Sequence, residues 1–165
     1  MPQHPFPPLY DKNSKILILG SFPSVKSREQ MFFYGHPQNR FWKVLSAVMG
    51  DETPVTIEEK RNFLLSNSIA LWDVIASCDI TGSSDSSIKN VVANELSEIF
   101  DNADIKQIFV NGKTAEKYYN KYIRDVIKRE AICLPSTSPA NAGWHVDKLI
   151  IEWKTIKLYL GDNNE

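Results

Sequence analysis

Four short runs of apolar, largely β-branched residues constrain the fold of this chain more than any other feature. They are KILILG (15–20), IALWDV (69–74), IKQIFVNG (105–112) and AICLPST (131–137). Each run is almost continuously apolar, which is typical of strands that are covered on both faces. Because helical patterns lie between the runs, the sequence predicts a parallel sheet with helices on both of its faces.

The segments between the runs predict the helices. TIEEKRNFLLSN (56–67) opens with Thr56 and Glu59 at the spacing of a capping box. Further helices are predicted at 40–49, 87–101, 114–128 and 145–160, and the polar stretch 79–87 is predicted to be a surface loop. No linker divides the chain, so we expect one three-layer α/β/α domain over residues 1–165, with a central parallel sheet of about four strands.

Composition indicates a globular protein, with 42% hydrophobic and 11% aromatic residues in 165. No apolar run approaches the roughly 18 residues that span a bilayer. The first ten residues, MPQHPFPPLY, lack the features of a signal peptide. We therefore expect a cytoplasmic protein without a membrane partner.

Cysteine content and net charge limit which cofactors the chain can bind and how large a DNA footprint it can have. Cys78 and Cys133 are too few for a four-cysteine iron–sulfur cluster, and no Cys/His spacing indicates zinc, so we expect no metal and no organic cofactor. The formal net charge of −1 argues against a large DNA footprint. A small footprint remains open, because a few cations beside backbone N–H groups can hold a short stretch of phosphates.

Polar and aromatic residues follow each predicted strand. The segments are GSFPS (20–24), WDV (72–74), NGK (111–113) and STSPAN (136–141), and FFYGHPQN (32–39) follows the first of them closely. Ligands of open parallel sheets bind at the carboxyl ends of the strands. The sequence therefore predicts that these segments converge on one binding site, although any α/β domain can display such an arrangement.

The same segments resemble those of a known family. HPQNRFWKVL (36–45) is similar to the HPxNRFWKV segment of mismatch-specific uracil-DNA glycosylases. GSFPS stands where that branch has GINPG, and STSPAN where superfamily members have NPSGLS or HPSPLS. With ALWDV (70–74), the chain resembles the uracil-DNA glycosylase superfamily over about residues 14–155, most closely its hypoxanthine-DNA glycosylase branch. The resemblance implies a uracil-DNA glycosylase-like fold and cofactor-free hydrolysis of the N-glycosidic bond of a flipped deaminated base.

The resemblance also implies a catalytic residue. Many relatives carry the Asp or Asn that handles the attacking water in the loop where this chain has Phe22, which cannot do so. Asn39 in the second motif is then implied to take over that role. An amide oxygen can orient a water, and an oxocarbenium-like transition state needs only a well-placed one. The alternative is that Asn39 merely caps the helix that begins near Arg40.

The remaining candidates divide between the base and the DNA backbone. The predicted base-binding residues are Phe22, Phe33, Trp72, Asp73, Ser136 and Asn141, and the predicted DNA-binding residues are Ser21, Ser24, Lys113, Ser138 and Trp144. For the aromatic residues, which include Tyr34 as a further case, core packing is the alternative to stacking on a base. Asp73 can instead brace a loop, and the serines and Asn141 can form turns. Lys113 can equally be a solvated residue at a helix start.

Three functions stay open at this point. The favoured one is excision of hypoxanthine from deoxyinosine by a monomeric enzyme that acts on DNA containing a deaminated base. Ser136, where some relatives have His, leaves room for a purine, and Phe22 offers a wide stacking face. A uracil or mismatch-specific glycosylase is the first alternative. A damaged-DNA-binding module that does not cut is the second.

Overall fold

Four parallel strands form the central sheet and align their carboxyl ends along one edge. They are β1 (Ile16–Gly20), β2 (Ile69–Asp73), β5 (Gln107–Asn111) and β6 (Ala131–Leu134), in the order β2-β1-β5-β6. Each strand lies within one of the four predicted apolar runs. The predicted α/β class and the parallel four-stranded sheet are therefore confirmed.

The computed structural model describes residues 2–161. Residue 1 and residues 162–165 of the predicted domain lie outside the described residues. One hydrophobic core cluster includes residues from all four strands of the sheet and from the helices that cover it. That the whole of 1–165 forms a single domain stays a prediction.

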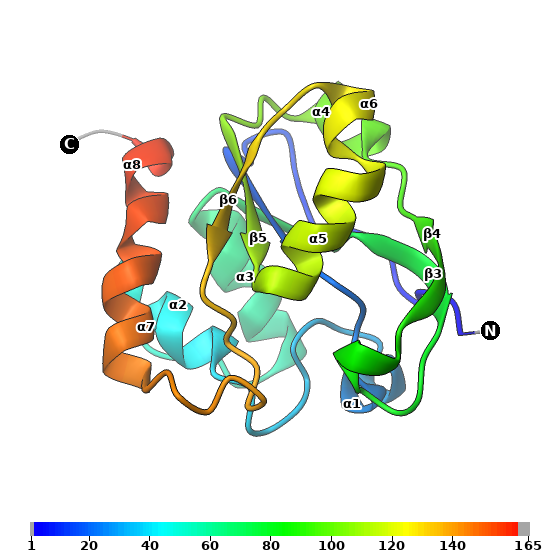
Figure 1. The fold of residues 1–165 in the computed structure, drawn as a ribbon. Helices are drawn as coiled ribbons and strands as arrows, with labels where there is room; N and C mark the ends of the chain where they lie inside the picture. The colour runs from blue at the N-terminus through cyan, green and yellow to red at the C-terminus, as the bar shows by residue number, and fades with distance from the viewer. Residues whose placement is uncertain (1, 162–165) are drawn as a thin grey trace.

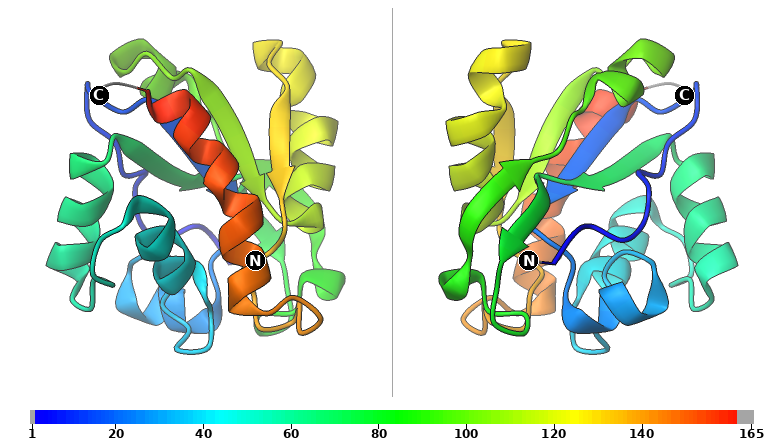
Figure 2. Two further views of the ribbon diagram at one scale, coloured as in Figure 1. Left: turned by 90° about the vertical axis from the view of Figure 1, so that its left-hand side faces the viewer. Right: turned by 90° about the vertical axis from the view of Figure 1, so that its right-hand side faces the viewer.

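Helices cover both faces of the sheet. Helix α7 (Val146–Trp153), which continues through η2 (Lys154–Ile156) into α8 (Lys157–Leu160), lies on the opposite face from α5 (Lys113–Tyr122) (Figures 1 and 2). The remaining helices and their bounds are α1 (Val25–Gln30), α2 (Phe41–Met49), α3 (Ile57–Ser66), α4 (Ser97–Asn102) and α6 (Arg124–Ile127). Helix α2 packs against α7, so the segment before α2 is held close to the sheet edge.

The predicted capping box at the start of α3 is present. The hydroxyl of Thr56 accepts a hydrogen bond from the N–H of Glu59, and the Glu59 carboxylate accepts one from the N–H of Thr56 at 3.1 Å. The backbone N–H groups of Val55 and Thr56 lower the pKa of Glu59, because they stabilise its charged form. The local sequence alone is sufficient to start this helix.

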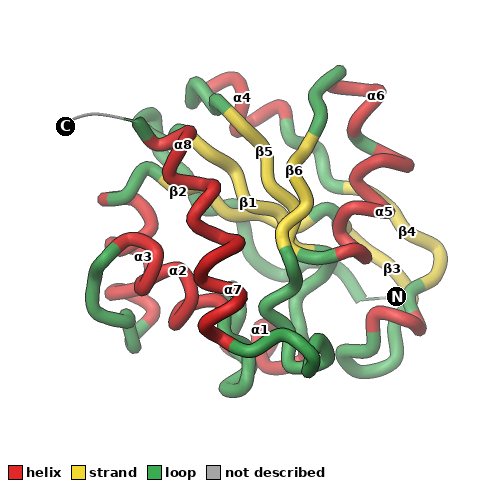
Figure 3. Tube along the Cα trace, turned by 60° about the vertical axis from the view of Figure 1, so that its left-hand side comes forward, coloured by secondary structure: helices red, strands yellow, loops and turns green. Residues whose placement is uncertain are grey.

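The helix predicted at 87–101 is wrong. The chain instead forms a hairpin of β3 (Ile75–Asp79) and β4 (Lys89–Ala93), with the short turn η1 (Asp85–Ser87) between the strands, and helical structure resumes only at α4 (Figure 3). Pairing with β3 satisfies the backbone of this segment, so tertiary contact overrides the helical spacing of its apolar residues. Asn90 adopts a positive φ of 55°, which interrupts a helix.

The segment before β1 is an arm that joins both sheets. Leu9 pairs with Leu71 of β2, and Gln3 pairs with Ser77 of β3, both in antiparallel bridges. Phe6 and Leu9 are buried in the core cluster. The arm is therefore an integral part of the fold beside the carboxyl end of β2.

Candidate active site

A cavity of about 290 Å³ opens at the carboxyl edge of the central sheet. Its walls come from the loops 20–24 and 136–140, which follow β1 and β6, and from residues between 33 and 39. Asp73 and Asn111 reach it from the ends of β2 and β5. Tertiary structure therefore brings the predicted loops together at one place, as expected for an open parallel sheet.

Asn39 lines this cavity and also supports the start of α2. Its amide oxygen Oδ1 accepts one hydrogen bond from the N–H of Phe41 at 2.9 Å and a second from the Thr137 hydroxyl at 2.8 Å. These two donors occupy both lone pairs of the oxygen. Asn39 is not the N-cap of α2, because that position falls on Arg40, but its bond to the N–H of Phe41 does support the first residue of the helix. The expectation that the amide oxygen orients the attacking water is wrong, since Oδ1 is occupied, whereas the Asn39 NH₂ group donates to none of residues 2–161.

A chain of hydrogen bonds holds the Asn39 side chain in place. The amide of Asn111 donates to the Thr137 hydroxyl at 3.0 Å and to the Tyr34 hydroxyl at 3.2 Å, and the N–H of Thr137 donates back to Asn111 at 3.1 Å. Thr137 is fully buried. Because each buried polar group has a partner, the network fixes the orientation of the Asn39 amide.

Asp73 lies at the end of β2 and is 4% exposed. Its Oδ2 atom lies 2.7 Å from Nε2 of His4, which comes from the N-terminal arm. A Cβ atom at Gly20 would lie 2.5 Å from the other carboxylate oxygen, Oδ1. The close approach of Asp73 to the neighbouring strand therefore requires glycine at position 20.

The aromatic residues fall into two groups. Phe22 and Tyr34 line the cavity, and the Tyr34 ring stacks on Phe41 at a centroid distance of 3.9 Å. Burial, and secondarily the charge of Asp73, raises the pKa of Tyr34 well above its usual value, so its hydroxyl stays neutral. Phe33 also lines the cavity, and both Phe22 and Phe33 pack in the hydrophobic core, with exposed fractions of 8% and 3%. Trp72 forms the second group, because it lies outside the lining with its ring 4.3 Å from that of His4.

Arg40 organises the loop after β6. Its guanidinium donates to the carbonyl oxygens of Ser138 at 2.7 Å, Asn141 at 3.2 Å and Thr137 at 3.3 Å. It also donates to the carbonyl of Trp144. One side chain therefore bridges four carbonyls of the segment 137–144, using the fixed fork of guanidinium donors.

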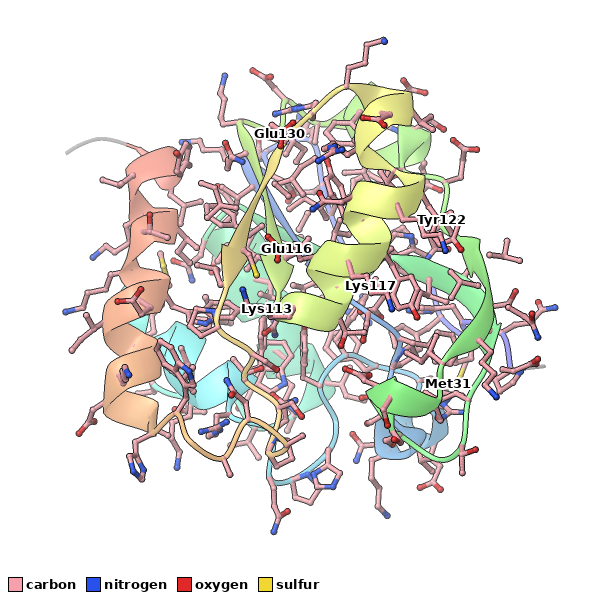
Figure 4. The ribbon with its side chains drawn as sticks, in the orientation of Figure 1. Met31, Lys113, Glu116, Lys117, Tyr122 and Glu130 are labelled. Atoms are coloured by element: carbon pink, nitrogen blue, oxygen red, sulfur yellow. The ribbon has the colours of Figure 1, made fainter. Side chains whose placement is uncertain are left out.

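A turn after β5 packs against the same loop. Gly112 has a φ of 97°, and a Cβ atom there would lie 2.9 Å from Cβ of Ser136. The glycine permits both the positive φ and the close approach. Lys113, at the start of α5, is exposed and lies outside the cavity lining (Figure 4).

The hairpin loop 79–87 closes the other side of the cavity. Ser83 and Asp85 line it, and the hydroxyl of Ser21 donates to Asp85 at 3.4 Å. Desolvation raises the pKa of Asp85, although hydrogen bonds from Thr114 and Ser21 oppose the shift. Arg28 ties this loop to α1 through a 2.6 Å bond to the carbonyl of Gly82. The predicted surface loop is exposed, and it also forms part of the site.

Comparison with known proteins identifies the family of this chain. The family model described as Uracil DNA glycosylase superfamily matches residues 7–156. The chain belongs to the uracil DNA glycosylase superfamily. The predicted family resemblance is therefore confirmed, and the site described above occupies the edge of a glycosylase domain.

Individual members of the superfamily are similar over nearly their whole length. A protein from Methanosarcina barkeri named "Hypoxanthine DNA glycosylase" is 35% identical over 143 residues, which cover 86% of this chain and 89% of the relative. A second protein of that name, from Methanosarcina acetivorans, is 33% identical over 92% of this chain and 95% of its own length. The solution NMR structure of a candidate uracil DNA glycosylase from Methanosarcina acetivorans aligns with a TM-score of 0.80 and 32% identity, covering 94% and 96% of the two chains.

The predicted site residues of this glycosylase-superfamily chain divide according to position. Those lining the cavity are Ser21, Phe22, Ser24, Phe33, Asn39, Asp73, Ser136 and Ser138. Those outside the lining are Trp72, Lys113, Asn141 and Trp144. The side-chain amide of Asn141 donates to the carbonyl of Ser136 at 3.0 Å, which stabilises the loop. The Nζ atom of Lys148 lies 4.3 Å from the centroid of the Trp144 ring.

Sequence reasoning missed His4, Arg40 and Asp85. Arg40 stands inside the HPQNRFW motif, so the motif itself was a signal for it. His4 and Asp85 had no comparable signal, because the first lies in a proline-rich arm and the second in a serine-rich loop. Within residues 2–161 no three His, Cys, Asp or Glu side chains cluster as metal ligands, and no helix is both long and apolar enough to cross a membrane.

Proposed function

We propose that this protein is a monofunctional DNA glycosylase that releases hypoxanthine from deoxyinosine. The observation that carries the proposal is the placement of Asn39, Asp73 and Phe22 around one cavity at the carboxyl edge of the sheet. The names of the two Methanosarcina relatives support hypoxanthine as the base. The base enters the cavity by flipping out of the duplex, because its glycosidic bond is inaccessible inside the stack.

Different residues of the cavity bind the base and the attacking water. Phe22 supplies an aromatic face for the flipped base, and Asp73 supplies an acceptor for a ring N–H group. The C1′–N9 bond breaks with its electron pair leaving on the base, and the oxygen of a water forms the new bond to C1′. The proton that this water loses passes through solvent to the departing base anion, which leaves as neutral hypoxanthine. The Asn39 NH₂ group holds that water by donating to its oxygen, since Oδ1 is already occupied.

Contacts to DNA complete the proposal. Ser21, Ser24 and Ser138, in the loops that line the cavity, bind phosphates of the damaged strand, and Lys113 at the start of α5, outside the lining, adds a positive charge for the same strand. The segment 142–144, ending in Trp144, fills the gap that the flipped nucleotide leaves. We propose that one chain suffices for these contacts, so the enzyme acts as a monomer.

Uracil is the second candidate base. The solved structure with a TM-score of 0.80 is described as a candidate uracil DNA glycosylase, and uracil offers Asp73 a ring N–H just as hypoxanthine does. Asp73 alone therefore does not separate the two bases. The proposal of hypoxanthine rests on the relatives' names and on the small side chain of Ser136.

One cleavage assay tests the proposal. Duplex oligonucleotides with a single deoxyinosine, a single deoxyuridine or no damage are incubated with excess protein, and abasic sites are revealed by hot alkali. We expect excision of deoxyinosine to exceed that of deoxyuridine, with no strand break before alkali. Preferred excision of uracil would support the second candidate, and tight binding without excision would support the non-cutting module.

A further inference from the structure

The N-terminal arm contacts the cavity residue Asp73 through His4. The N–H of His4 donates to the carbonyl of Ala76 at 2.7 Å, and the carbonyl of Pro2 accepts from the N–H of Cys78 at 3.2 Å. These backbone bonds fix the arm along β3, beside the carboxyl end of β2. The His4 side chain is therefore held in a defined position next to Asp73.

The pair of His4 and Asp73 is almost completely buried. Their side chains are 3% and 6% exposed, and Nε2 of His4 lies 2.7 Å from Oδ2 of Asp73. A carboxylate only accepts hydrogen bonds, so Nε2 carries the hydrogen. The other ring nitrogen, Nδ1, is buried and has no hydrogen-bond partner within residues 2–161. An unpaired buried nitrogen costs free energy, so packing alone does not account for a histidine here.

Only one oxygen of the Asp73 carboxylate is used in this pair. The second oxygen, Oδ1, accepts no hydrogen bond from residues 2–161 and lies beside Gly20 and the Tyr34 hydroxyl. Gly20, Tyr34 and Asp73 all line the cavity. A carboxylate with only a structural role would accept hydrogen bonds from protein donors on both of its oxygens. The Asp73 carboxylate instead leaves Oδ1 as an acceptor on the cavity side.

We propose that His4 is a specificity-determining positioning residue, which fixes Asp73 so that Oδ1 accepts a hydrogen bond from a ring N–H of the flipped base. This inference rests on the proposed function of the same site. Hypoxanthine carries a hydrogen on N1, whereas N1 of adenine carries a lone pair that faces the carboxylate unfavourably. The pair therefore selects the deaminated base against its parent. It does not select against guanine, whose N1 also carries a hydrogen.

Binding to an uncleavable probe tests the inference independently of catalysis. The probes are two duplexes with a 2′-fluoroarabino nucleoside at the damage site, one bearing hypoxanthine and the other bearing unsubstituted purine, which lacks the N1 hydrogen. Their dissociation constants are measured by fluorescence anisotropy. We expect the parent protein to prefer hypoxanthine by about 10-fold, the amount expected for one hydrogen bond to a charged group.

Variants of the arm separate the hydrogen bond from general packing. In His4→Leu the preference for hypoxanthine falls to within about twofold, whereas His4→Gln retains most of it because the glutamine amide can donate to Oδ2. Leu9→Ala serves as the control, since it weakens the arm at a buried position that pairs with Leu71 while the His4–Asp73 hydrogen bond stays in place, so we expect the preference to be unchanged. Urea unfolding confirms that each variant is folded under the binding conditions.

The outcomes separate this inference from the proposed function. No preference in the parent, or an unchanged preference in His4→Leu, overturns the role of His4 even if deoxyinosine is cleaved. A preference that follows His4 supports the inference even if no cleavage is found. In that case only the catalytic proposal fails.

Discussion

Replacement of Asn39 by alanine separates catalysis from support of the start of α2. The change removes the acceptor for the N–H of Phe41, which is worth about 1 kcal/mol for a capping bond. It also leaves the buried hydroxyl of Thr137 without its acceptor, at a further cost of about 1–3 kcal/mol. We therefore expect the free energy of unfolding to fall by about 2–4 kcal/mol, from the sum of these two terms.

The rate of excision should fall much further than this loss of stability explains. If Asn39 holds the attacking water, misplacement of that water costs at least about 100-fold in rate. The assay is single-turnover excision of deoxyinosine with enzyme in saturating excess, at a temperature where urea unfolding shows that the variant is folded. Under these conditions binding and protein concentration do not limit the rate.

Thr56→Ala is the matched control for this experiment. Thr56 also accepts a hydrogen bond from a backbone N–H at a helix start, that of Glu59 at 3.0 Å, and it is exposed and absent from the cavity lining. We expect it to lose about 1 kcal/mol of stability and to cut at the parent rate. If Asn39→Ala also cuts within a few-fold of the parent, Asn39 only supports the start of α2 and the water-binding role is refuted.

Four further predictions concern the loop after β6, DNA and metal. Ser136→His should lower excision of deoxyinosine more than that of deoxyuridine, since Gly112 blocks one side of residue 136 and the imidazole must enter the cavity; an unchanged ratio of single-turnover rates contradicts this. Arg40→Met should weaken DNA binding more than the cleavage rate at saturation, because the carbonyls of 137–144 lose their bridge; equal effects on the two in an enzyme titration would argue otherwise. The salt dependence of binding should correspond to release of fewer than about five counterions, and a steeper slope indicates a larger basic interface. EDTA should leave activity intact, and a loss reversed by one divalent ion would reveal a metal requirement.

The sequence by itself determined the central sheet and the loops that follow its strands. Residues 16–19 and 108–110, the apolar cores of the runs 15–20 and 105–112, are buried on both faces, and a short continuous apolar segment of this kind can be identified from local composition. The capping box of Thr56 and Glu59 is equally local, since both partners lie within one helical turn. The convergence of the loops then follows from the parallel order of the strands.

Tertiary structure decided the features that depend on contacts between distant segments. Residues 89–93 form a strand because β3 is available to pair with them, although their apolar spacing also suits a helix. His4 meets Asp73 across 69 positions, and Arg40 meets the carbonyls of 137–144 across about 100. The geometry of such bonds depends on where the whole backbone places each segment. For that reason the sequence located the cavity, whereas only the folded chain showed which side chains orient its polar groups.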